Sequence, residues 1–274
     1  MPPLTGKRAL VTGASSGIGA AIARLLADDG CELVLTARRK HALDAVAAEC
    51  TTRGATVHVI AADLGTPGGA AALWTAATAA GGIDILVNNA GFGYFRPFAD
   101  AGADRDAELL QLNVASLVEL SRRFVAARAG QPSRAYLLNI ASIAAYQSVP
   151  NFAVYASSKA FVRNFTEALH DELAGSAISA TCVCPGGTKT EFHAQAGAGN
   201  YSWLANRSMM SAEAVATIAL RAMRKGKRTA IPGLLNKLSC WSVRLVPRWL
   251  ASWMSRRVLG EPRAGALPPR TGAA

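Results

Sequence analysis

The chain has 274 residues, of which 51% are hydrophobic, enough for one large domain with a substantial core. Its five cysteines form no even disulfide framework and match no common metal site, so we expect a reducing, cytoplasmic setting without a bound metal. The first residues show no export signal.

The formal net charge is +11. Residues 1–220 hold 17 basic and 17 acidic side chains, and residues 221–274 hold 12 basic and one acidic. This local excess indicates contact with something anionic rather than a generally basic, nucleic-acid-binding surface.

Short apolar runs alternate with segments of helical length along most of the chain. Strands buried on both faces are predicted at 8–12, 32–36, 56–60, 83–87, 135–140 and 179–183. Helices are predicted at 18–29, 40–53, 67–80, 104–129 and 153–174. This alternation predicts a Rossmann-type, doubly wound α/β domain with a mostly parallel sheet and helices on both faces. Ligands of such sheets bind beyond the carboxyl ends of the strands.

A glycine-rich loop, VTGASSGIG, follows the first predicted strand. Gly13, Gly17 and Gly19 lack the side chains that would obstruct a tight turn and the approach of a diphosphate to amides at a helix N-terminus. Their spacing differs from the usual dinucleotide fingerprint, so a purely structural turn is the alternative.

A tyrosine and a lysine stand four residues apart in a predicted helix. Tyr155 and Lys159 therefore share one helix face and can meet. A free phenol, with a pKa near ~10, releases its proton reluctantly at neutral pH, and a nearby ammonium favours the phenolate. The pair can therefore move protons, whereas a solvated surface pair is the alternative reading.

Five motifs, in order, resemble the short-chain dehydrogenase/reductase family over residues 5–232. They are TGASSGIG (12–19), NNAG (88–91), Asn113, Ser142 with YASSK (155–159), and PGGTKT (185–190). The resemblance implies a seven-stranded sheet ending near 228–232, in one catalytic domain over residues 1–232. It also implies an NAD(P)-dependent oxidoreductase that interconverts carbonyl and alcohol.

The resemblance implies a role for each catalytic candidate. Tyr155 is the general acid/base, since hydride transfer to a ketone needs a proton for the developing alkoxide. Lys159 lowers the pKa of Tyr155 and holds the nicotinamide ribose, and Ser142 polarises the substrate carbonyl. Asn113 anchors a water that links Lys159 to solvent. Taken alone, Ser142 could be a turn residue and Asn113 a helix-bridging residue.

The end of the second strand predicts the cofactor. Ala37 stands where family members that use NAD carry Asp, and Arg38, Arg39 and Lys40 follow. These three cations can bind a 2′-phosphate, so NADP(H) is predicted. The alternative, a helix that simply begins at the surface, stays open for Arg39 and Lys40. The expected cofactor-binding residues are Thr12, Gly13, Ser15, Ser16, Gly17, Ile18, Gly19, Arg38, Asp63, Leu64, Asn89, Ala90, Gly91, Tyr155, Lys159, Pro185, Gly186, Thr188 and Thr190. Asp63 could otherwise be an N-cap.

The resemblance places the substrate pocket among the segments after the fourth, fifth and sixth strands. The candidate residues are Phe92, Tyr94, Ser142, Tyr146, Phe152, Phe192 and Trp203. Their composition indicates a hydrophobic ketone or aldehyde and leaves acyl-chain and ring-bearing substrates open. These segments could equally pack on one another.

Residues 233–260 extend beyond the family pattern. Leu and Trp recur there at helical spacing, Pro247 interrupts the run, and basic residues punctuate it. The segment could lie on an anionic membrane surface, or pack on the domain or a second subunit and wall the pocket. Residues 261–274, rich in Pro, Gly and Ala, are predicted to be disordered.

A homodimer through the helices at 104–129 and 153–174, or a homotetramer, is expected. A non-catalytic NADP(H)-binding scaffold or redox sensor, docked on a membrane or partner through 233–260, is the alternative function. Nucleic-acid binding is not expected, since the basic end carries no recognition motif.

Overall fold

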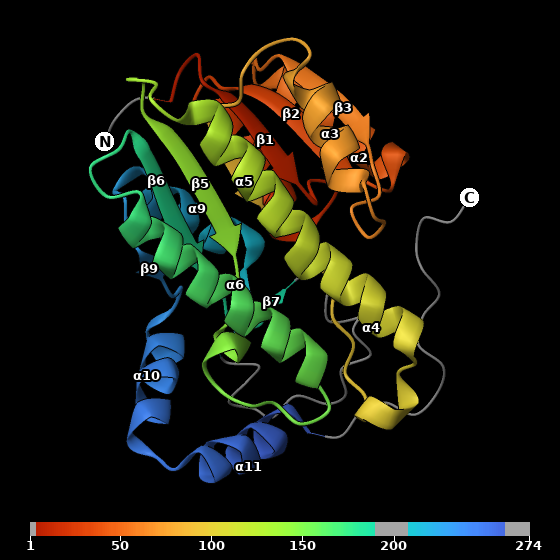
Figure 1. The fold of residues 1–274 in the computed structure, drawn as a ribbon, viewed down its shortest axis with the longest axis vertical. Coiled ribbons are helices and arrows are strands. Elements are labelled where there is room, and N and C mark those ends of the chain that lie inside the picture. Colours follow the sequence, from red (N-terminus) through yellow and green to blue (C-terminus); the bar gives the residue numbers. More distant parts are fainter. Residues whose placement is uncertain (1–3, 190–207, 261–274) are drawn as a thin grey trace.

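The computed structural model describes residues 4–189 and 208–260. Its main sheet has seven strands in the order β3-β2-β1-β4-β5-β6-β9, and every pairing is parallel (Figure 1). The strands are β1 (Arg8–Thr12), β2 (Glu32–Ala37), β3 (Val57–Ala61), β4 (Ile85–Asn88), β5 (Ala135–Ile140), β6 (Ile178–Val183) and β9 (Thr229–Ala230). The Val, Leu and Ile runs of β1, β4 and β5 are buried throughout, which confirms the predicted doubly wound sheet.

Helices cover both faces of the sheet. One face carries α1 (Gly17–Asp28), α2 (Lys40–Thr52) and α9 (Ala212–Arg224), whose apolar residues share a core with the strands. The other face carries α3 (Gly69–Thr78), α5 (Ser116–Arg128) and α6 (Ala153–Glu172). In Figure 1, α5 and α6 lie in front of the sheet, and α9 lies behind it. All but α9 correspond to predicted helices. The ends of α1, α2, α3 and α6 differ from the predicted ones by up to two residues, whereas α5 forms only the second half of the helix predicted at 104–129.

The helix predicted at 104–129 is interrupted. It consists of α4 (Ala103–Leu110), a π-helical turn η2 (Gln111–Ala115) and α5. A π turn inserts an extra residue into the helix and often marks a functional position. Here it carries Asn113, which is buried.

The C-terminal extension forms α10 (Leu234–Ser242), a 3-10 turn η4 (Val243–Leu245) and α11 (Arg248–Leu259), with the predicted break at Pro247. Both helices lie beyond the carboxyl ends of the strands, below α6 in Figure 1. No helix among the described residues is both long enough and apolar enough to cross a bilayer.

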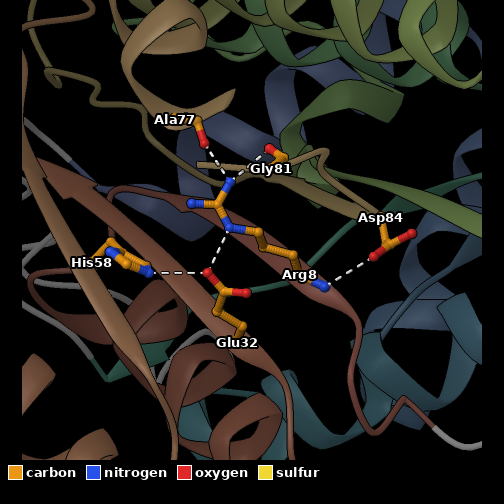
Figure 2. A network of polar contacts seen from close by, with 6 residues as sticks. All are labelled: Arg8, Glu32, His58, Ala77, Gly81 and Asp84. Carbon is orange, nitrogen blue, oxygen red and sulfur yellow. Dashed lines mark hydrogen bonds and ion pairs between the residues drawn. The ribbon is translucent and has the colours of Figure 1, made fainter. Parts of the chain in front are cut away.

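At the opposite, amino edge of the sheet, Arg8 forms a network of hydrogen bonds and an ion pair (Figure 2). The Arg8 guanidinium donates to Glu32 Oε1 at 2.7 Å, Ala77 O at 2.5 Å and Gly81 O at 2.7 Å. Its backbone N–H donates to Asp84 Oδ2 at 3.0 Å. Arg8 is buried, and its charge is therefore compensated inside the protein rather than by water.

Candidate active site

A cavity of about 790 Å³ opens at the carboxyl edge of the sheet. Among the described residues, it is lined by the glycine loop, the ends of β2 and β5, the first turns of α6, and α10 and α11. The predicted site residues that line it are Gly13, Ser15, Ser16, Gly17, Ile18, Arg38, Asp63, Leu64, Asn89, Ala90, Gly91, Phe92, Ser142, Tyr146, Phe152, Tyr155, Lys159, Pro185, Gly186 and Thr188. The edge predicted for the ligand site is therefore where these residues gather.

Four predicted residues lie behind the lining. Thr12 Oγ1 accepts hydrogen bonds from the backbone N–H groups of Asn89 and Ala90, both at 3.0 Å, and so joins β1 to the end of β4. A Cβ at Gly19 would lie 2.3 Å from Gly13 O, so only glycine lets α1 start this close to the loop. Asn113 and Tyr94 are the other two.

Tyr94 is buried and packs in a cluster with Leu109 and Tyr155, instead of lining the cavity as a substrate residue would. The predicted residues Thr190, Phe192 and Trp203 lie outside the residues that the structure describes.

Tyr155 and Lys159 meet on the first turns of α6, as their spacing predicts. Lys159 Nζ lies 5.8 Å from the centroid of the Tyr155 ring and donates to Ile140 O, at the end of β5, at 2.9 Å. Both side chains are buried. Burial lowers the pKa of Lys159 to about 8, because a desolvated ammonium is destabilised relative to the neutral amine.

Asn113, on the π turn, is linked to the segment of Tyr155 and Lys159 by hydrogen bonds. Its Nδ2 donates to Phe92 O at 2.9 Å and to Ser158 Oγ at 3.1 Å, and its Oδ1 accepts from Phe92 N at 3.1 Å. Ser158 Oγ in turn donates to Tyr155 O at 2.7 Å. A Cβ at Gly91 would lie 2.9 Å from Asn113 Oδ1 and 3.3 Å from Lys159 Nζ, so this glycine permits the close approach.

The Tyr155 ring is held on its face by Phe152, with ring centroids 4.3 Å apart and an interplanar angle of 22°. The backbone of Gly93 also presses on this ring, since a Cβ there would lie 2.6 Å from Tyr155 Cδ2. The ring therefore has little freedom to turn away from the cavity.

A second tyrosine in the cavity differs from Tyr155. Burial raises the pKa of the Tyr146 phenol above its ordinary value, so Tyr146 is a poor proton donor. Ser142, which follows β5, caps the 3-10 turn η3 (Ile143–Tyr146) and accepts from Ala144 N at 3.1 Å. As a hydroxyl that accepts here, it still has a proton to donate into the cavity.

The cations after β2 are arranged differently from the sequence expectation. Arg38 Nη1 lies 3.3 Å from Glu108 Oε1, a carboxylate that also binds Arg105 at 3.1 Å. Arg39, for which a surface position had been the alternative, lines the cavity and donates to Ser16 Oγ at 3.4 Å. Lys40 is exposed and pairs with Asp44. Arg39 is therefore, beside Arg38, a candidate for binding a phosphate.

The lining fits a dinucleotide. The loop at 13–18 runs into the N-terminus of α1, where backbone N–H groups and the helix dipole favour an anion. Asp63 and the segment 89–91 line the same cavity, as a nucleoside-binding set would. Asp63 Oδ1 also accepts a hydrogen bond from Gly65 N at 2.8 Å, so the carboxylate stabilises the turn at residues 63–65.

The extension supplies a wall that the family motifs did not indicate. Its cavity-lining residues include Leu235, Asn236, Leu238, Ser239, Cys240, Val243, Val246, Ala251, Met254, Ser255, Val258 and Leu259. Asn236 Nδ2 donates to Pro232 O at 2.8 Å, and the Asn236 amide packs directly on Gly186, where a Cβ would lie 2.4 Å from Nδ2. Ser255 Oγ donates to Ser148 O at 3.0 Å. Burial raises the pKa of the Cys240 thiol to about 12, so it remains neutral. The extension therefore packs on the domain and walls the cavity.

Comparisons with known proteins agree with this site. A sequence model of the short chain dehydrogenase family matches residues 7–200. The chain is 34% identical over 188 residues, 69% of its length, to the uncharacterized oxidoreductase YvrD of Bacillus subtilis, and this match spans 71% of that protein. Two further relatives are longer, and the match spans 15% of one and 32% of the other.

Solved structures show the same fold. A short-chain dehydrogenase from Sphingobium yanoikuyae in complex with NADPH has a TM-score of 0.77 at 30% identity, covering 92% of this chain and 94% of that one. A short chain dehydrogenase/reductase from Burkholderia phymatum in complex with NAD has a TM-score of 0.79 at 26% identity. The match covers 96% of this chain and 100% of that one. The chain therefore belongs to the short-chain dehydrogenase family of oxidoreductases, whose structural neighbours bind nicotinamide cofactors.

Proposed function

We propose that the protein is an NADP(H)-dependent oxidoreductase that interconverts a hydrophobic ketone or aldehyde and its alcohol. The observation that carries this proposal is the burial of Tyr155 beside Lys159 in a cavity that also contains Ser142 and the glycine loop. A scaffold that only binds a nucleotide has no need of a buried ammonium beside a phenol, because burying that charge destabilises the fold.

A nicotinamide bound beside this pair would supply or accept the hydride at the carbonyl carbon. In reduction, the Ser142 hydroxyl donates to the substrate carbonyl oxygen and stabilises the charge that develops there. Tyr155 then transfers its phenolic proton to that oxygen. In oxidation, the Tyr155 phenolate removes the proton from the alcohol.

Lys159 serves this proton transfer through its charge. Its ammonium, 5.8 Å from the Tyr155 ring centroid, favours the phenolate and so makes the phenol a better acid. Asn113 positions the pair through Ser158 and the backbone of Phe92. A water held near Asn113 and Lys159 would return the proton to the site.

The preference for NADP(H) rests on the end of β2. Ala37 offers no carboxylate for a ribose 2′-hydroxyl, whereas the guanidinium groups of Arg38 and Arg39 border the cavity. Arg38 would exchange or share its contact with Glu108 when a 2′-phosphate binds.

An apolar substrate is supported by the cavity walls. Phe92, Phe152 and Val149 line the side toward α6, and Leu235, Val243 and Val246 line the side toward the extension. Such a lining favours ligands with a large apolar surface and few polar groups. It accommodates either an acyl chain or a ring system.

A homodimer, or a tetramer built from it, is proposed on the faces of α4 and α6. Leu110 on α4 and Phe161 on α6 are large apolar side chains that remain exposed, and Phe161 stacks on Phe165 at 5.7 Å. Light scattering of the purified chain measures its molar mass directly, and a monomeric mass would contradict this assembly.

The test of the proposed function is oxidation of NADPH and NADH against aliphatic, aromatic and long-chain ketones and aldehydes. We expect turnover with NADPH, and a loss of at least ~10³-fold in kcat for Tyr155→Phe because the proton donor is gone. Tyr136→Phe is the matched control, since it removes a buried hydroxyl from a tyrosine on β5 outside the cavity lining. Turnover that survives Tyr155→Phe would refute the assigned role.

A further inference from the structure

The extension leaves most of its large apolar side chains exposed to solvent. Among the described residues, eight of the eleven large hydrophobic side chains that are exposed belong to it. They are Leu234, Leu235, Leu238, Trp241, Leu245, Trp249, Trp253 and Met254. The buried positions of α10 and α11 are small or polar instead, namely Asn236, Cys240, Ala251 and Ser255. We call the set of eight side chains, with the basic residues among them, the outer face of the extension.

This arrangement is not explained by packing on the domain. The inner face already makes the contacts that attach the extension, through Asn236 to Pro232 and Ser255 to Ser148. The outer Trp241 and Trp249 are nevertheless 60% and 71% exposed. An apolar patch of this kind on a folded domain marks an interaction surface.

The charge of the outer face specifies the partner. Lys237, Arg244, Arg248, Arg256 and Arg257 are all exposed, and residues 233–260 contain no Asp or Glu. The Arg257 guanidinium also lies 5.2 Å from the centroid of the Trp253 ring. Tryptophan and basic side chains on one face suit the headgroup region of an anionic bilayer, where the indole is partly immersed and the cation meets phosphate.

The mouth of the active-site cavity lies within the same face. Leu235, Leu238 and Met254 line the cavity and are also exposed, by 46%, 54% and 49%. The apolar rim of the cavity is therefore continuous with the surface that carries the tryptophans.

We propose that the outer face docks on an anionic lipid surface and that the cavity opens toward the lipid. An apolar carbonyl compound dissolved in the bilayer would then reach Tyr155 without crossing water. The identity of that substrate rests on the proposed function, whereas the docking itself does not.

The first experiment is co-sedimentation of the full chain with vesicles of phosphatidylglycerol and phosphatidylcholine, compared with pure phosphatidylcholine. We expect binding to the anionic vesicles that weakens with salt, and at least tenfold weaker binding for Arg244→Glu/Arg248→Glu and for Trp241→Ser/Trp249→Ser. The matched control is Lys225→Glu/Lys227→Glu, two exposed cations at the turn between α9 and β9, on the amino edge of the sheet. This control should bind as the unmodified chain does.

Two results of this experiment overturn the proposal. One is an unmodified chain that stays in the supernatant with anionic vesicles at low salt. The other is an equal loss of binding in the Lys225→Glu/Lys227→Glu control, which would indicate attraction by net charge alone. Far-UV circular dichroism shows that each variant is folded. No readout depends on turnover, so failure here is distinguishable from failure of the proposed function.

The second experiment tests the position of the cavity mouth. Leu238→Cys and, as control, Lys225→Cys are each labelled with a polarity-sensitive fluorophore, since the five native cysteines are buried. On anionic vesicles, the emission of the label at 238 should shift to shorter wavelength and that at 225 should not. Vesicle binding without a shift at 238 would show that the mouth faces away from the lipid.

A second copy of the chain is the competing occupant of the outer face. Light scattering of the unmodified chain and of Trp241→Ser/Trp249→Ser decides this. An unchanged molar mass supports the lipid surface. A lower molar mass in the variant, together with no vesicle binding by the unmodified chain, would assign the face to subunit contact instead.

Discussion

Each edge of the central sheet contains a buried cation, and the two cations differ in their hydrogen-bond partners. At the amino edge, Arg8 donates to the carboxylate of Glu32 and to two backbone carbonyl groups (Figure 2). At the carboxyl edge, Lys159 donates to the neutral carbonyl of Ile140, and within the described residues it has no ion pair. Both side chains are buried.

The difference fits a structural role for Arg8 and the proposed functional role for Lys159. A buried cation with a carboxylate partner, as at Arg8, holds three segments together. A buried cation without one destabilises the fold, and its pKa falls to about 8 for Lys159. Sites of this kind persist where a reaction needs the group, and the rest of the fold offsets their instability.

The largest expected effect is at the carboxyl edge. Lys159→Met should reduce kcat/KM by at least ~10³-fold, because the phenol loses the adjacent positive charge and the cofactor loses a ligand. The free energy of unfolding at pH 7 should stay equal or rise. Burying the ammonium costs on the order of 3 kcal/mol, which is the displacement of its pKa from 10.5 to about 8 expressed as free energy. Urea unfolding and steady-state kinetics measure both quantities.

The same lysine predicts a pH dependence with a definite sign. Below pH 8 the ammonium is present in both folded and unfolded chains, so the destabilisation is complete. Between about 8 and 10.5 the unfolded chain binds the extra proton, so the stability of the unmodified protein should rise relative to Lys159→Met. Over the same range, kcat/KM for carbonyl reduction should fall as the charge is lost. A variant that unfolds more easily than the unmodified chain at pH 7 would make Lys159 a structural residue.

The next effect is at the amino edge. Arg8→Met should lower the free energy of unfolding by about 3 kcal/mol, because Glu32 and the carbonyl groups of Ala77 and Gly81 lose their buried partner. The kcat/KM of the folded fraction should change less than twofold. Arg53→Met is the control, since its pair with Asp28 is largely exposed and should contribute at most ~0.5 kcal/mol. A loss of activity in folded Arg8→Met would break the separation between the two edges.

The smallest expected effect concerns the cations that border the cavity. Arg38→Ala and Arg39→Ala should each raise the KM for NADPH by about tenfold and leave the KM for NADH unchanged, since only NADPH carries the 2′-phosphate. Lys40→Ala, which removes an exposed lysine paired with Asp44, is the control. Equal changes for both cofactors would indicate that the arginines shape the loop and do not select the phosphate.

Local sequence determined most elements of this fold and the pairing of Tyr155 with Lys159. The Val, Leu and Ile runs predicted strands that are buried on both faces of the sheet, because a strand can be apolar throughout only if both faces are covered. Such strands are typical of a parallel sheet. The spacing of Tyr155 and Lys159 determined that they share a helix face, since side chains four residues apart always do. The glycine loop likewise lies where a strand runs into a helix.

The tertiary structure decided what depends on distant contacts. Asn113 occupies a π turn because its amide satisfies the backbone of Phe92 and the hydroxyl of Ser158. Helical periodicity showed that the extension is amphipathic, but which face turns inward depended on Asn236 fitting against Gly186 and Ser255 reaching Ser148. Periodicity is a property of one segment, whereas orientation is set by the surface on which that segment packs.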